Sequence, residues 1–171
     1  MTDRQRAAIH ESGHVCCALL LGIPHYGAVV FDEGRGVAST TPETATPITN
    51  ETHTPEILDV IYQGRSLPEL MRDATLTAAG HVAVTLATDP TGTVYVTGLD
   101  KRMIAAACWR AFAEADLHVI NAWETLAVAR ARHLLGPCFY RVRAVADELH
   151  RRGMLTADDV ARTMFPEAEK Q

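Results

Sequence analysis

The stretch Arg6-Ala-Ala-Ile-His-Glu-Ser-Gly-His-Val-Cys-Cys-Ala-Leu-Leu-Leu21 carries the strongest structural signal in this chain. Helix-forming residues and regularly spaced apolar positions predict one helix over about residues 3–21. Asp3 can cap the start of this helix, and Gly22 and Pro24 end it. Because apolar residues stand on both sides of the polar ones, we expect the helix to be largely buried.

His10 and His14 are four residues apart, so on a helix they project from the same face about one turn apart. Their imidazole nitrogens can then bind one zinc ion at about 2.0–2.1 Å. Glu11 follows the first histidine and can reach a water on the metal, from which it takes a proton as a general base. Two imidazoles and a carboxylate on a buried helix need polar partners, and one metal ion satisfies both rings. The alternative is a helix whose His and Glu side chains are solvated or packed in the core.

The rest of the chain predicts a mainly α protein with one small β element. Two β-type runs around a glycine turn indicate a hairpin over about residues 26–41, and residues 42–54 are typical of an irregular loop. Ser66 is placed to cap a helix from Leu67 to about Thr88, and Trp109 and Trp123 are assigned to the core. Further helices are predicted over about 100–116, 118–135, 138–152 and 156–164. We therefore expect one domain over residues 1–171, with the motif helix, the hairpin and a helical bundle over about 55–165.

Composition excludes several classes of protein. The 171 residues include 16 basic and 21 acidic side chains, a formal charge of −5, which argues against a nucleic-acid binder with a broad basic surface. The longest nearly apolar stretch, Val15 to Ile23, is far shorter than the ~20 residues that a membrane span needs. The N-terminal residues do not resemble a secretory signal, and the four cysteines lack framework spacing. We expect a cytoplasmic protein with reduced cysteines.

The motif helix resembles the active-site helix of the peptidase domain of FtsH-type AAA zinc metalloproteases. In that family a helix reading A-x-HEAGH-A-x-x-A-x-x-L precedes a short β segment, then a helix with small residues. A Thr-Gly turn then opens a helix that bears an aspartate. Leu76-Thr-Ala-Ala-Gly-His-Val-Ala-Val84 and Thr97-Gly-Leu-Asp100 stand at the corresponding places here. The resemblance implies a helical zincin-like fold, zinc bound by His10, His14 and Asp100, and Glu11 as the general base.

The third ligand has alternatives. The family's turn carries an Asn before the aspartate and is longer than Thr97-Gly-Leu-Asp100, so Asp100 can also be interpreted as a plain helix N-cap. His81, Asp89 and His118 are the other candidates. His81 stands in an apolar helical run, where the sequence favours a satisfied core histidine.

The resemblance implies a zinc metalloendopeptidase. FtsH proteins place an ATPase module and membrane segments before this domain, and no G-x-x-x-x-G-K-[ST] motif occurs in the sequence. We therefore expect a stand-alone metalloprotease that hydrolyses peptides, unstructured segments or substrates delivered by a partner. A homo-oligomer and a separate ATPase partner both stay open. So do two other functions: a dedicated regulatory protease that cleaves one partner protein, and a non-catalytic interaction module stabilised by zinc.

Overall fold

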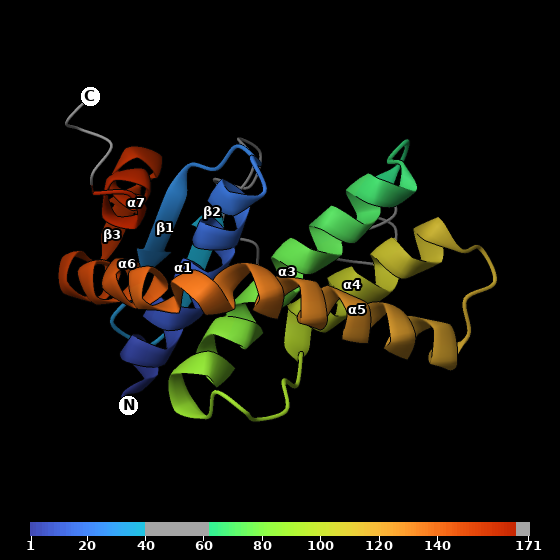
Figure 1. Ribbon diagram of the computed structural model, residues 1–171, viewed down its shortest axis with the longest axis horizontal. Helices are drawn as coiled ribbons and strands as arrows, with labels where there is room; N and C mark the ends of the chain where they lie inside the picture. Colours follow the sequence, from blue (N-terminus) through green and yellow to red (C-terminus); the bar gives the residue numbers. More distant parts are fainter. Residues whose placement is uncertain (40–61, 167–171) are drawn as a thin grey trace.

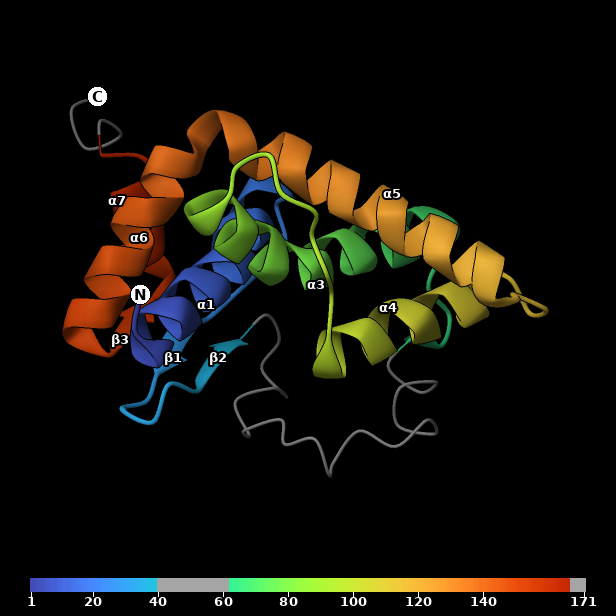
Figure 2. The same ribbon diagram turned by 90° about the horizontal axis from the view of Figure 1, so that it is seen from below.

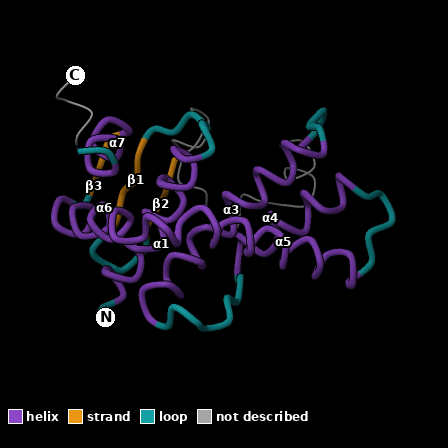
Figure 3. Tube along the Cα trace, viewed as in Figure 1, coloured by secondary structure: helices purple, strands orange, loops and turns teal. Residues whose placement is uncertain are grey.

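Helices make up most of the structure, and three short strands gather beside the first helix (Figures 1 and 3). The computed structural model describes residues 1–39 and 62–166. The mainly α fold with a small β element is confirmed. The predicted loop over 42–54, the end of the hairpin at 40–41 and the start of the bundle at 55–61 lie outside the described residues. The elements are α1 (Asp3–Leu20), β1 (Gly27–Val30), β2 (Gly36–Ser39), α3 (Leu67–Thr88), α4 (Gly98–Ala111), α5 (Leu117–Leu135), the 3-10 turn η2 (Gly136–Cys138), α6 (Phe139–Arg152), β3 (Met154–Thr156) and α7 (Ala157–Met164).

The N-cap of helix α1 is one residue earlier than expected, at Thr2 rather than at Asp3. Thr2 is the N-cap: its hydroxyl accepts the Gln5 N–H, and the Gln5 side chain accepts the Thr2 N–H. This reciprocal pair satisfies two backbone donors at the helix start, so Asp3 is the first helical residue and the cap predicted there is wrong. After Leu20 the chain leaves the helix and turns at Gly22, where φ is +65°, a conformation that glycine adopts without strain.

The sheet has the strand order β2-β1-β3, with both pairs antiparallel. Gly27 of β1 pairs with Ser39 on one side and with Thr156 on the other. The pairing of β1 and β2 is the predicted hairpin, whereas β3 was not predicted. Figure 2 shows the sheet lying along α1, which also packs against α3 and α6.

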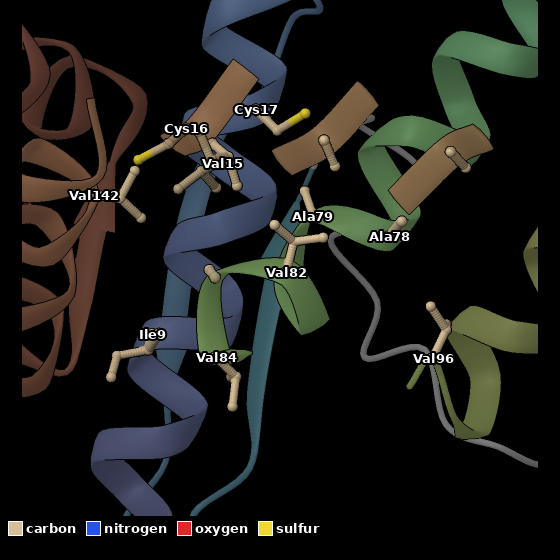
Figure 4. Close-up of a cluster of buried hydrophobic side chains, with 14 of the residues drawn as sticks. Ile9, Val15, Cys16, Cys17, Ala78, Ala79, Val82, Val84, Val96 and Val142 are labelled. Atoms are coloured by element: carbon tan, nitrogen blue, oxygen red, sulfur yellow. The ribbon is translucent and has the colours of Figure 1, made fainter. Parts of the chain in front are cut away.

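The core is built around α1, most of whose residues are buried. Figure 4 shows side chains of α1 and α3 in one apolar cluster, with Val15 and Cys16 on the first helix and Ala79 and Val82 on the second. A Cβ added at Gly13 would lie only 2.5 Å from the backbone oxygen of Ala79, so glycine lets the two helices approach closely.

Two predictions about the core have different outcomes. Trp123 is buried, as expected, but Trp109 is 53% exposed on α4, so its assignment to the core is wrong. The four cysteines are free, with Cys16, Cys17 and Cys108 buried. Among the described residues, no helix combines the length and the apolar character needed to cross a bilayer.

Candidate metal centre

Two helices bring the predicted site residues together. Helix α1 carries His10, Glu11 and His14, and α4 carries Asp100 in its first turn, after its N-cap Thr97. Both helices pack against α3, so the start of α4 is held near the middle of α1. Asp100 is therefore not the N-cap of its helix, and its carboxylate is turned toward the histidines instead.

The three predicted metal ligands form a compact group. The Nε2 atoms of His10 and His14 are 3.0 Å apart, and the Oδ2 atom of Asp100 lies 3.3 Å from the first and 3.8 Å from the second. Ligands about 2.0–2.1 Å from a tetrahedral zinc ion are about 3.3–3.4 Å from one another, and the three distances lie around that value. Among the described residues, His10, His14 and Asp100 form the group whose ligand atoms all lie within 4.8 Å of one another. The donor set and its spacing therefore fit zinc, and we call these three residues the ligand group.

His14 is held in the form that binds metals. Its Nδ1 atom is 2.9 Å from the backbone oxygen of Leu76 on α3. A carbonyl oxygen only accepts, so Nδ1 carries the proton and Nε2 presents its lone pair to the ligand group. Burial is the main cause that lowers the pKa of His14, and the neighbouring His10 lowers it further. The imidazole is accordingly neutral at physiological pH.

Asp100 is ionised. Burial by itself would raise the pKa of its carboxyl, but hydrogen bonds from His10 and His81 hold the pKa well below its usual range. A carboxylate faced by imidazole nitrogens supplies the anionic oxygen that a divalent cation prefers. The ligand group therefore combines two nitrogen donors with one negative charge.

Glu11 lies beside the ligand group without belonging to it. Its side chain is between α1 and β2, where the backbone N–H of Ala38 donates to its carboxylate, and a Cβ at Gly36 would collide with it. Burial raises the pKa of Glu11 to about 7, and the charge of Asp100 raises it as well, while His14 and the Ala38 N–H oppose the shift. A carboxyl with a pKa near neutrality can both take up and release a proton at physiological pH.

A cavity of about 600 Å³ opens beside these side chains. Its lining includes His10 and Glu11 from α1, Gly36 from β2, His81 from α3 and Thr97 at the start of α4. The candidate base and one candidate ligand thus face a space large enough for several residues of a peptide.

The backbone of α3 closes the other side of the histidine pair. A Cβ added at Gly80 would lie 2.5 Å from Nε2 of His14 and 2.6 Å from Cε1 of His10. Real Cβ atoms do not approach other heavy atoms so closely, so the two rings occupy space that only glycine leaves free. Gly80 is therefore a part of the site that the sequence analysis did not assign.

The other candidates for the third ligand have separate outcomes. His81 is a largely buried histidine with a polar partner outside the ligand group, as the sequence favoured: its Nε2 atom lies 3.1 Å from Oδ2 of Asp100. Its ring also lines the cavity, which the sequence did not indicate. Asp89 instead accepts the N–H and hydroxyl of Thr91 in the loop after α3, at 3.2 and 3.0 Å. His118 is exposed on α5. The Gly80-His81 pair could have indicated the role of His81, because a glycine inside a helix often marks a close approach.

No protein-family model and no curated protein matches this chain. Support for a function therefore comes from the residues and their geometry.

Proposed function

We propose that this chain is a zinc-dependent endopeptidase of the FtsH-like type, acting on peptides or unfolded protein segments. The observation that carries the proposal is the convergence of His10, His14 and Asp100 on one point, with the carboxylate of Glu11 beside them. Two histidines, one aspartate and a separate glutamate are the parts that zinc-dependent peptide hydrolysis needs.

The residues have distinct tasks in this reaction. His10 and His14 offer nitrogen ligands, and Asp100 offers an anionic oxygen. When bound, zinc supplies Lewis acidity, which acidifies water and polarises the carbonyl of the peptide bond to be cleaved. Glu11 takes the proton from the attacking water and passes it to the leaving amine, a double task that suits a carboxylate beside the ligand group and open to the cavity.

The neighbouring strand favours an extended peptide as substrate. In the described sheet β2 is an outer strand, and the N–H of Ala38 already reaches toward the site to bond Glu11. A peptide that paired with β2 through main-chain hydrogen bonds would run past Glu11 along the cavity. Such pairing requires an unfolded segment, which is why we expect peptides and unstructured chains as substrates.

The resemblance to FtsH-type peptidases adds support in the order of the elements. A helix with His-Glu-Ser-Gly-His is followed by a hairpin, by a second helix with small residues, and by a Thr-Gly turn that opens the helix of Asp100. The shorter turn before Asp100 still allows its carboxylate to reach within 3.3 Å of His10 Nε2.

The test is the substitution Glu11→Gln, which keeps the size of the side chain and removes its basicity. With zinc-loaded protein, a peptide library and an unfolded protein serve as substrates, and mass spectrometry records the cleavage. We expect kcat to fall at least about 100-fold. The zinc content, measured by atomic emission, should stay at the wild-type value.

The matched control is Glu114→Gln, at an exposed position away from the site, which should cleave at the wild-type rate. A zinc-loaded wild-type protein that cleaves none of these substrates would overturn the proposal. So would equal cleavage by the wild type and Glu11→Gln.

A further inference from the structure

His81 reaches the candidate metal centre from a third helix. It lies near the middle of α3, and its Nε2 atom is 3.1 Å from Oδ2 of Asp100. The same oxygen lies 3.3 Å from Nε2 of His10, and the rings of His10 and His81 meet edge to face with centroids 4.9 Å apart. One carboxylate oxygen therefore contacts two imidazoles from different helices.

His81 is nevertheless outside the ligand group. The described residues whose ligand atoms all lie within 4.8 Å of one another are His10, His14 and Asp100. Ligands on opposite sides of a zinc ion, each about 2.1 Å from it, are at most about 4.2 Å apart. His81 thus contacts Asp100 and the ring of His10 without sharing a common centre with the whole group.

The proton on His81 follows from its partner. An ionised carboxylate only accepts hydrogen bonds, so a ring nitrogen 3.1 Å from it is the donor. The N–H of Thr97 also points to Nε2 of His81, but at 3.5 Å this contact is too long to be a strong hydrogen bond. The stronger contact therefore assigns the proton to Nε2.

We infer that His81 is a positioning residue for Asp100: its Nε2–H donates to the carboxylate and holds the ligand oxygen where the metal needs it. Asp100 is only three residues into α4, and its side chain has rotational freedom that a metal would otherwise have to remove. Hydrogen-bond partners of metal ligands typically strengthen metal binding by 10–100-fold in this way. The inference rests on the proposed zinc centre and adds a residue to it.

The first experiment compares His81→Leu, which removes the donor, with His81→Gln, whose amide keeps an N–H at a similar distance. The zinc dissociation constant is measured by competition with a chromophoric chelator. We expect roughly 10–100-fold weaker binding for His81→Leu and at most about 3-fold for His81→Gln. His118→Leu, at an exposed position on α5, is the control and should bind zinc as the wild type does.

The visible spectrum of the Co²⁺-loaded proteins separates a positioning role from direct ligation. If His81 acts through Asp100, the absorption bands of His81→Leu keep the wild-type positions, because the ligand atoms are unchanged. Bands that shift as expected for the loss of a nitrogen ligand would overturn the inference. Unchanged zinc affinity in His81→Leu would also overturn it.

A measurement on the wild type needs no variant. The ¹⁵N shifts of the histidine rings in the zinc-loaded protein report which nitrogen carries a proton, and we expect the proton of His81 on Nε2. An unprotonated Nε2 would overturn the inference. If the wild type bound no zinc at all, the proposed function would fail instead, so the two failures can be told apart.

Discussion

Two aspartates in this molecule have different sets of polar partners. Asp159, at the start of α7, accepts the N–H and hydroxyl of Thr156 at 3.0 and 2.9 Å, and also faces the guanidinium groups of Arg152 and Arg162 at 3.1 and 2.7 Å. We call these four residues the capping cluster. Every partner in it is a donor, and two of them are always positively charged. The carboxylate is therefore satisfied by the chain itself.

Asp100 is surrounded by imidazoles instead. Oδ2 faces Nε2 of His10, His14 and His81 at 3.3, 3.8 and 3.1 Å, and these four residues form the histidine–aspartate cluster. Nε2 of His14 presents a lone pair because its proton is on Nδ1. A carboxylate and a lone pair directed at the same point are ligands that one cation between them could share. One aspartate therefore completes a helix end, whereas the other lies in a group that could hold the metal ion of the proposed function.

The largest expected effect is on zinc affinity, which should fall in a variant of the histidine–aspartate cluster and stay the same in a variant of the capping cluster. Asp100→Ala removes an anionic ligand, and we expect zinc binding to weaken by more than the roughly 10–100-fold that the loss of an outer hydrogen-bond partner costs. Asp159→Asn should leave the zinc dissociation constant unchanged. Chelator competition measures both variants, and equal affinities for Asp100→Ala and the wild type would remove the distinction.

Zinc itself should stabilise the fold through the histidine–aspartate cluster. At a free zinc concentration 100 times the dissociation constant, binding adds about 2.7 kcal/mol to the free energy of unfolding, or roughly 5–10 °C in Tm. Thermal unfolding followed by circular dichroism, with zinc and with a chelator, measures this shift. The same rise in Asp100→Ala would show that zinc acts elsewhere on the protein.

Acid should weaken the capping cluster, and we expect this effect on Tm to be smaller than that of zinc. Hydrogen bonds from the Thr156 backbone and from Arg152 hold the pKa of Asp159 well below its usual range. A lowered pKa contributes stability above the unfolded-state value of about 3.9, and this stability is lost as the pH falls below it. In chelator, the Tm advantage of the wild type over Asp159→Asn should therefore narrow from pH 6 to about pH 3. A Tm difference that did not change with pH would contradict the lowered pKa of Asp159.

The smallest effect is expected from Arg162→Gln. The side chain of Arg162 is 59% exposed, and Asp159 keeps Arg152 and Thr156 as partners. Because exposed ion pairs contribute little, we expect a change in Tm of about 2 °C or less and no change in zinc binding. A Tm loss as large as that of Asp159→Asn would mean that this one pair holds the capping cluster together.

Local patterns sufficed to predict where α3 and α7 begin. The predicted bounds of α3 match the structure because Ser66 and Glu69 form a capping box at its start, and Thr156 with Asp159 does the same for α7. The residues of these capping boxes lie within four positions of the helix start, so the sequence alone indicates them.

Features that depend on distant partners were missed. The strand Met154–Thr156 has only three residues and exists through its pairing with β1, more than 120 positions earlier. Such short strands carry no alternation of their own. Trp109 lies on α4, which was predicted over about 100–116 and ends at Ala111, and helical periodicity does not tell which face meets a neighbour.

The site residues also divide into those that local spacing predicts and those that depend on distant contacts. His10, Glu11 and His14 share one helix, so their spacing alone predicts that they lie together. Asp100 was assigned through the family resemblance, since its approach depends on how α4 packs. His81 was assigned to the core because its neighbours Ala79 and Val82 are apolar, and its place in the cavity lining was missed because adjacent residues on a helix point in different directions.

The missing side chain at Gly80 limits how this sequence can change. Any other amino acid there would push its first carbon into the rings of His10 and His14, so even the single methyl group of alanine is too large. At Gly136 an added carbon would meet nothing within 4 Å. In a saturation library selected for activity, codon 80 should retain only glycine, while codon 136 should accept alanine freely.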